Sequence, residues 1–107
     1  MAMLAANIAL SFGSAAILHA VASGSRFGFD IMQVTGLTSG TVYPALDRLE
    51  SAGYLKSSWE DASEAHAEGR PARRYFTLTA AGVKALRAAL EKYRALRPIA
   101  GFSPEEA

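Results

Sequence analysis

The sequence predicts a mostly α-helical α+β domain that contains one β-hairpin. A capped helical pattern lies between Thr38 and Gly53, two short alternating segments flank a polar stretch after it, and apolar residues recur at spacings of three and four near the C-terminus. The first and third patterns are typical of helices and the second of a hairpin. With 107 residues, half of them apolar, one domain with one core is expected, and a partner subunit would add stability.

Two helices are predicted before residue 38. Ser11 is a suitable N-cap for a helix that runs to about Ala22, where Ser23-Gly24-Ser25 ends it. Its core face is expected to hold the aliphatic side chains Ile17, Leu18 and Val21. A short second helix is predicted from Phe27 to Val34, before Thr35-Gly36. Residues 1–10 could extend the first helix or form a separate arm, and this choice stays open.

A third helix is predicted over residues 38–52, with Thr38 supplying a side-chain oxygen at the N-cap and Gly53 taking the positive φ that ends it. Its apolar stripe consists of Val42, Ala45, Leu46, Leu49 and Ala52. Tyr43, Asp47 and Arg48 therefore face away from the core. Two short helices joined through a glycine-containing turn, the second exposing its first turn, match the helix-turn-helix pattern.

A β-hairpin follows, with strands predicted at Tyr54–Trp59 and Arg74–Leu78. Trp59 is expected to anchor the hairpin to the core, and stacking on a ligand is the alternative. The polar segment from Glu60 to Pro71 lacks strand-forming residues and is too long for a tight turn, so we predict a mobile tip. The chain has a net charge of +1, but three arginines fall within five positions here: Arg70, Arg73 and Arg74. Positive charge is therefore expected to concentrate on one arm of the hairpin.

A last helix is predicted after Thr79, which is a suitable cap. Alternating spacings of three and four predict a coiled-coil-like seam and a dimer interface at Val83, Leu86, Leu90 and Tyr93. Pro98 is expected to end the helix. The predicted organisation is a winged domain with an N-terminal apolar helix or arm over residues 1–79, a dimerisation helix over 80–97 and a flexible tail over 98–107.

Several function classes are disfavoured by what the sequence lacks. It has no cysteine, which excludes disulfides, Cys metal ligands and thiol catalysis and suits a reducing cytoplasm. His19 and His66 are isolated, and no carboxylate, Ser or Lys constellation indicates catalysis. We therefore expect neither an enzyme nor a bound metal or cofactor.

The first 25 residues carry no charged side chain, which raises the alternative of a signal peptide or membrane anchor. No Lys or Arg precedes the apolar run, and polar or small residues interrupt it: Asn7, Ser11, Gly13, Ser14 and His19. A buried helix in a protein that does not associate with membranes is the interpretation we adopt.

Five ordered segments carry a family resemblance: Thr41-Val42-Tyr43-Pro44-Ala45-Leu46-Asp47-Arg48-Leu49-Glu50, Gly53-Tyr54-Leu55, Gly69-Arg70-Pro71, Arg73-Arg74-Tyr75 and Leu78-Thr79-Ala80-Ala81-Gly82. Over roughly residues 11 to 97 the chain resembles the PadR family of transcriptional regulators, which are winged helix-turn-helix proteins. It is similar to the small members, with a single C-terminal helix. The resemblance implies a homodimer formed by the last and first helices, and often a repressor released by small aromatic or drug-like molecules.

A palindromic double-stranded DNA operator is the predicted partner, with helix 38–52 in the major groove and half-sites about one helical turn apart. The candidate DNA-binding residues are Thr38, Ser39, Gly40, Thr41, Tyr43, Pro44, Arg48, Lys56, Arg70, Arg73 and Arg74. The free N–H groups of a helix N-terminus attract phosphate, and arginines on a hairpin can follow the DNA backbone or minor groove. Plain capping, ordinary ion pairs of Arg48 with Asp47 or Glu50, and packing of Tyr43 are the alternatives.

A winged helix used only for protein–protein contact is the competing hypothesis. The nearly neutral net charge and the acidic residues at the hairpin tip favour it. The operator sequence, the effector and the direction of regulation stay open.

Overall fold

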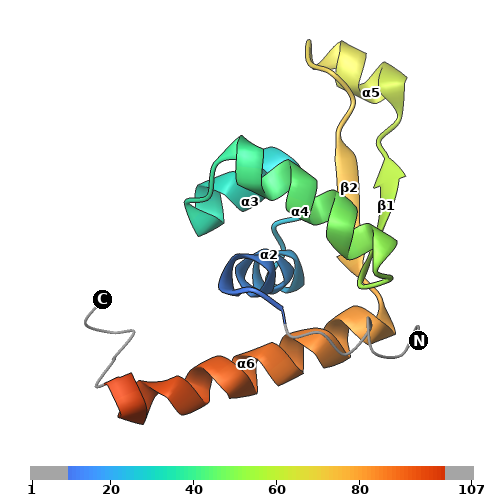
Figure 1. Ribbon diagram of the computed structural model, residues 1–107. Helices are drawn as coiled ribbons and strands as arrows, with labels where there is room; N and C mark the ends of the chain where they lie inside the picture. The colour runs from blue at the N-terminus through green and yellow to red at the C-terminus, as the bar shows by residue number, and fades with distance from the viewer. Residues whose placement is uncertain (1–9, 101–107) are drawn as a thin grey trace.

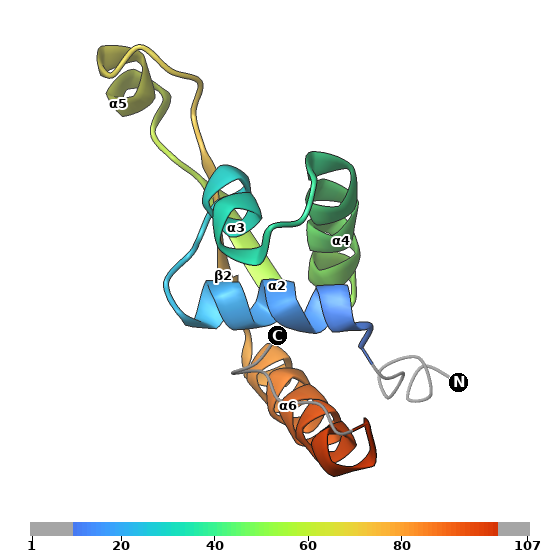
Figure 2. The same ribbon diagram turned by 90° about the vertical axis from the view of Figure 1, so that its left-hand side faces the viewer.

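The computed structural model describes residues 10–100, with side chains described as far as Arg94. In this range the elements are α2 (Phe12–Ala22), α3 (Gly28–Thr35), α4 (Ser39–Ser51), β1 (Leu55–Trp59), α5 (Ala62–Ala67), β2 (Arg74–Leu78) and α6 (Ala80–Ala100). Helix α2 lies in the middle, with α3 and α4 on one side and α6 on the other, while the hairpin extends outward with α5 at its end (Figures 1 and 2). The predicted mostly helical α+β fold is confirmed.

The hydrophobic core surrounds α2, whose Ile17 and Leu18 are fully buried. Every described element except α5 contributes side chains to this core. Besides those of α2, the core residues include Ile31, Val42, Leu46, Leu49, Leu55, Phe76 and Leu86. Helices α3, α4 and α6 and strand β2 all pack against α2. This packing fixes the relative positions of α3, α4 and the hairpin, which form the candidate site.

The first two helices begin and end close to the predicted residues. The Ser11 hydroxyl accepts a hydrogen bond from the Ser14 N–H at 3.1 Å, as an N-cap does. Helix α3 begins and ends one residue later than predicted, and the Gly36 that follows it closes the helix in the left-handed conformation, with a φ of 75°.

Four of the five residues of the predicted stripe on α4 are buried, namely Val42, Ala45, Leu46 and Leu49. Ala52 is exposed at the C-cap, so its assignment to the stripe is wrong. Gly53 takes the predicted positive φ, at 84°. The predicted side-chain cap is wrong, because Thr38 occupies the N-cap position without a bond from its side chain to the helix backbone. Its hydroxyl instead donates to the Thr41 hydroxyl at 3.4 Å. Pro44 lies inside the helix and has no N–H, so the Gly40 carbonyl lacks its usual donor.

The hairpin strands pair antiparallel, from Leu55 opposite Leu78 to Trp59 opposite Arg74. The segment predicted to be a mobile tip contains a short helix, α5, that the sequence analysis did not predict. The carboxylate of Asp61 caps it by accepting hydrogen bonds from the N–H groups of Ser63 and Glu64. Alanine is the best helix former, so a capped, alanine-rich segment can form a short helix despite its polar composition. We call residues 55–78 the wing.

Helix α6 starts against the turn between α4 and β1. The Thr79 hydroxyl accepts from the Gly82 N–H at 3.0 Å and donates to the Gly53 carbonyl at 2.6 Å, which confirms the predicted cap. The helix continues to Ala100, so the predicted end at Pro98 is wrong. A proline this close to the end removes only one N–H donor, and the last residues keep helical dihedrals.

The expected arm falls largely outside the described residues, as do residues 101–107 of the predicted tail. Between residues 10 and 100, no helix combines the length and the apolar character needed to cross a bilayer.

Candidate nucleic-acid interface

The first turns of α4 form an exposed end that gathers most of the residues predicted on this helix to contact DNA. Thr38, Ser39, Gly40, Thr41 and Pro44 are all exposed. The first N–H groups of a helix have no acceptor within it, and together with the helix dipole they attract anions. This end of α4 therefore suits a phosphate or the edge of a DNA groove.

Tyr43 is both exposed and packed. Its side chain is 49% exposed, and its ring covers the first turn of α3. A Cβ atom on Gly28 would lie 2.5 Å from the Tyr43 hydroxyl oxygen and 2.6 Å from Cζ. The packing interpretation of Tyr43 is therefore correct, and half of the side chain is still available to a partner.

Arg70 is held inside the wing by two carboxylates. It forms a bidentate ion pair with Glu60, at 2.5 and 2.7 Å, and a second pair with Glu68 at 3.0 Å. The backbone N–H of Arg73 also donates to Glu60, at 3.1 Å. These contacts lower the pKa of the Glu60 carboxyl to about 2, mainly through the hydrogen bond from Arg70. A phosphate would have to compete with both carboxylates for this guanidinium.

Arg74 joins the wing to α4. Its guanidinium pairs with Glu50, contacts Asp47 at 3.4 Å and donates from Nε to the Ser57 hydroxyl at 3.0 Å. The two α4 carboxylates that could have paired with Arg48 are thus bound by Arg74 instead. The three arginines lie together on one arm of the hairpin as expected, but nearby acidic side chains compensate the charge of Arg70 and Arg74.

Three of the predicted DNA-binding cations have no carboxylate partner among the described residues: Arg48, Lys56 and Arg73. Arg48 and Lys56 are exposed. The Arg73 guanidinium lies over the Phe27 ring, with Cζ 4.2 Å from the ring centroid, and it interacts with the Glu60 carboxylate only at longer range, without forming an ion pair. These three side chains are the cations most available to phosphates.

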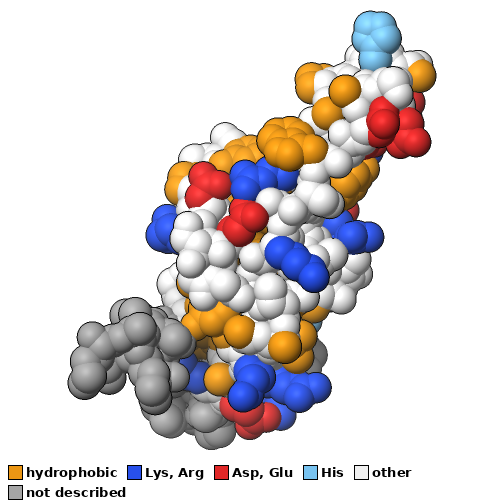
Figure 3. Space-filling view, turned by 90° about the vertical axis from the view of Figure 1, so that its right-hand side faces the viewer, with side chains coloured by type: hydrophobic (Ala, Val, Ile, Leu, Met, Phe, Trp, Pro, Cys, Tyr) orange, Lys and Arg blue, Asp and Glu red, His pale blue; other side chains and the backbone are white. Residues whose placement is uncertain are grey.

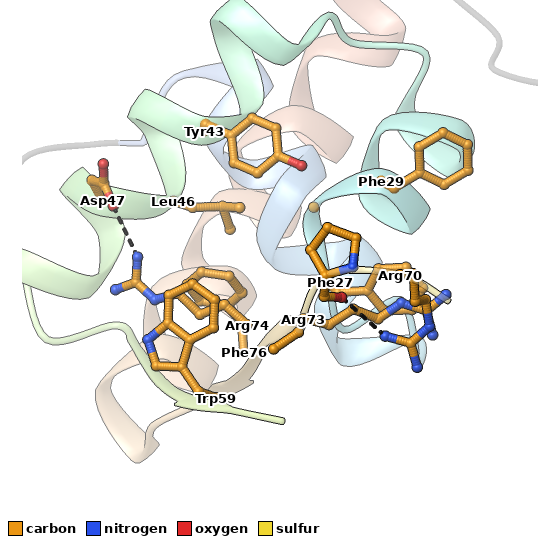
Figure 4. Close-up of a pocket in the computed structure, with 13 residues that line it drawn as sticks. Phe27, Phe29, Tyr43, Leu46, Asp47, Trp59, Arg70, Arg73, Arg74 and Phe76 are labelled. Atoms are coloured by element: carbon orange, nitrogen blue, oxygen red, sulfur yellow. Dashed lines mark hydrogen bonds and ion pairs between the residues drawn. The ribbon is translucent and has the colours of Figure 1, made fainter. Parts of the chain in front are cut away.

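The wing, α3 and α4 enclose an open cavity of about 660 Å³. Aromatic side chains form much of its wall, and all three wing arginines border it (Figure 4). The aromatic residues are Phe27, Phe29, Tyr43, Trp59 and Phe76. The prediction that Trp59 anchors the hairpin to the core is wrong, because this side chain is 69% exposed.

Asp47 and Phe29 are site residues that the sequence prediction missed, and Trp59 was included only through the alternative that it stacks on a ligand. Each lines the cavity from a different element. The outward position of Asp47 was predictable from the helical period, but nothing in the local sequence places Phe29 and Trp59 beside it.

Charge on the surface is mixed rather than gathered into one large basic patch. On the face in Figure 3, basic side chains are spread over the body and the base of the molecule, and acidic side chains lie beside them there as well as near the outer end of the wing. Contacts to DNA would therefore depend on a few placed cations. Among the described residues, no group of three His, Cys, Asp or Glu is placed to hold a metal ion.

The predicted dimer seam on α6 divides between two faces. Leu86 is only 7% exposed and belongs to the core of its own chain, so it is wrong as an exposed seam residue. Tyr93 also packs within its own chain, since its hydroxyl donates to the Leu10 carbonyl at 2.9 Å and its ring meets Phe12 edge-on. Val83 and Leu90 are exposed. The seam divides because α6 lies along α2.

Comparison with known proteins gives a family match. The model of the transcriptional regulator PadR-like family matches residues 17–88, more than half of the chain. Such proteins are regulators and not enzymes, as the sequence predicted. The comparison with curated proteins finds no match.

Three solved structures illustrate the likeness of the fold. A PadR family transcription regulator from Clostridium difficile has a TM-score of 0.72 at 22% identity, over 83% of this chain and 94% of that chain. A Streptococcus mutans protein has a TM-score of 0.68 at 26% identity, over 85% and 86%. The PcaV transcriptional regulator from Streptomyces coelicolor, in complex with its natural ligand, has a TM-score of 0.73 at 17% identity, over 91% and 66%.

Proposed function

Because this chain belongs to the PadR-like family of transcriptional regulators, we propose that it is a sequence-specific DNA-binding repressor that acts as a cytoplasmic homodimer and is released by a small aromatic ligand. One observation carries the proposal. The exposed end of α4 and the wing lie on the side of α2 away from α6 (Figure 1). One side of the molecule is thus available to DNA while α6 is available to a second subunit.

In the proposed complex α4 enters the major groove and the wing follows the flanking backbone. The exposed hydroxyls of Ser39 and Thr41 and the helix N–H groups meet phosphates, and the Tyr43 ring packs against sugar and methyl groups. Arg48, Lys56 and Arg73 supply the positive charge. Thr38, Gly40 and Pro44 shape the backbone of the contacting turn, and Arg70 and Arg74 hold the wing in position.

The proposed homodimer uses the outer face of α6. Val83 and Leu90 are two exposed apolar side chains seven residues apart, a helical repeat typical of a seam. Phe12, which contacts Tyr93, is 70% exposed and extends this apolar surface from α2. Two-fold symmetry would place the two α4 helices at half-sites about one helical turn, ~34 Å, apart.

The cavity beside α4 supports the proposed release by a ligand. Its volume of about 660 Å³ lies within the range of small-molecule sites, and its walls are aromatic. The Arg73 guanidinium at its edge has no carboxylate partner among the described residues. A ligand seated there would occupy space between α4 and the wing and compete directly with DNA.

Fluorescence anisotropy titration tests the DNA-binding proposal. The full chain is titrated against DNA from its own promoter with random competitor DNA, at several salt concentrations. Saturable binding that survives competitor supports a regulator that acts on its own promoter.

Sedimentation tests the proposed dimer. Leu90→Glu is expected to shift sedimentation toward the monomer and to weaken DNA binding, whereas Ala88→Glu, at another exposed position of α6, changes neither. Unchanged sedimentation of both variants would contradict the proposed interface.

A module that binds a protein instead of DNA is the second candidate. The neutralisation of Arg70 and Arg74 by four carboxylates favours it, because it lowers the positive potential of the wing. Weak binding that salt abolishes equally for promoter and random DNA is the result expected from this candidate.

A further inference from the structure

We infer that Asp47 recognises a cytosine and so determines one position of the DNA sequence that this chain prefers. The inference rests on the proposed DNA-binding function. Asp47 lies one helical turn after Tyr43 on the outward side of α4, and its side chain is 71% exposed. Figure 4 shows it extending from α4 toward Arg74 at the edge of the cavity.

A carboxylate on a helix that enters a DNA groove is repelled by the phosphates. Here Arg74 reduces that repulsion, because its Nη1 lies 3.4 Å from Asp47 Oδ1. The contact is long, and the shorter contacts of the guanidinium are with Glu50 and Ser57. Asp47 is thus partly neutralised but not enclosed by its partner.

One oxygen of Asp47 stays available. In the described part of the chain, hydrogen bonds and ion pairs reach only Oδ1. Glu50 shows the opposite arrangement, since Arg74 contacts its Oε1 and the Ser57 hydroxyl donates to its Oε2 at 2.7 Å. Of the two α4 carboxylates near the wing, Glu50 uses both oxygens to bind the wing, whereas Asp47 keeps one oxygen, Oδ2, available as an acceptor.

An ionised carboxylate can only accept hydrogen bonds, so it requires a donor on the DNA. Base edges in the major groove offer two amino donors, cytosine N4 and adenine N6. The adenine amino group lies beside the N7 acceptor, which repels a carboxylate, and cytosine lacks that neighbour. Asp47 Oδ2 therefore favours cytosine, while Arg74 holds Oδ1.

Selection of binding sequences from a random duplex pool tests this inference. The full chain and the variants Asp47→Asn, Asp47→Ala and Asp47→Glu are compared, with Glu64→Gln on α5 as the matched loss of one exposed charge. The wild type is expected to select cytosine at one position in each half-site. The asparagine variant shifts that position toward adenine and the alanine variant loses the preference, a change of roughly tenfold in relative affinity. The glutamate variant retains cytosine, and the control changes no position.

Two results would overturn the inference while leaving the proposed function in place. One is an unchanged preference at every position in the Asp47 variants. The other is an equal gain in affinity for all sequences, which a change in net charge alone would produce. A wild-type chain that selects no sequence contradicts the proposed DNA-binding function itself, and the inference with it. Thermal unfolding of each variant, expected to match the wild type, separates these results from misfolding.

Discussion

The Tyr43 ring in α4 occupies the space that a side chain at Gly28 in α3 would require. Its hydroxyl oxygen and Cζ lie 2.5 and 2.6 Å from where a Cβ atom of residue 28 would be. Helices α3 and α4, which both line the cavity, are thus in direct contact through the Tyr43 ring and Gly28. The position of the exposed tyrosine depends on the absence of a side chain in its neighbour.

Gly28→Ala is therefore expected to displace the Tyr43 ring. The ring is half-exposed and can rotate, so the loss in the free energy of unfolding should be small, about 1 kcal/mol, at the lower end for an overpacked site. The affinity for DNA should nevertheless fall. Urea unfolding and anisotropy titration measure the two effects. Gly13→Ala, where a Cβ atom would meet nothing within 4 Å, is the control. Full DNA affinity of Gly28→Ala would show that the ring position does not matter.

Gly82→Ala should be far more damaging. A Cβ atom there would lie 3.0 Å from the carbonyl carbon of Tyr54 and closer still to its oxygen, and these are backbone atoms. Since neither partner can rotate away, the start of α6 must shift, at a cost of about 3 kcal/mol in unfolding free energy. Urea unfolding against the same Gly13→Ala control measures this. Equal stability of the two variants would contradict the rigid contact.

Acid should loosen the wing before it unfolds the core. Folding lowers the pKa of Glu60 from 4.5 to about 2, so its ion pair adds stability that is complete above pH 4.5 and is lost as the pH falls toward 2. Amide protection in residues 60–73, taken as the exchange rate relative to the intrinsic rate at each pH, should decrease over that range. Glu60→Gln should show reduced protection already at neutral pH and little further loss on acidification. An acid response in this variant equal to that of the wild type would assign the effect to another group.

The wing arginines should differ in their effect on DNA binding. Arg73→Ala removes a cation that forms no ion pair among the described residues, so affinity should fall for all sequences and the salt slope should decrease by about 1. Arg74→Ala leaves the carboxylates of Asp47 and Glu50 without their cationic partner. These carboxylates then repel the phosphates more strongly, so the affinity for DNA should fall for this reason too. Lys84→Ala, exposed on α6, is the control. Titrations at four or more salt concentrations measure the slopes, and an unchanged slope for Arg73→Ala would remove this residue from the interface.

Patterns local in the sequence predicted most elements of the fold. The stripe from Val42 to Leu49 repeats with the helical period, so both the helix and its buried face follow from the residues alone. Helix α5 was missed because six residues with a single buried side chain, Ala65, cannot display a period. The alanines and the Asp61 cap were the only local signals of it.

Contacts between distant residues were beyond sequence reasoning. Arg74 meets Asp47 across 27 positions, and no spacing rule links a strand residue to a particular residue of an earlier helix. The division of the α6 seam had the same origin. Leu86 and Leu90 both fit the spacing of three and four, so the sequence does not distinguish them. The packing of α2 against α6 buries Leu86 in the core and leaves Leu90 exposed.

Gly82 lies against the backbone carbonyl of Tyr54, and this close contact between backbone atoms constrains where α6 starts relative to the rest of the domain. The outward side chains of α4 take no part in it. If the proposed dimer reads two half-sites, their separation is encoded at this junction and their sequence on α4, so the two properties are physically separable. Exchange of Asp47 or Arg48 could then redirect the protein to new DNA sites without altering the distance between them.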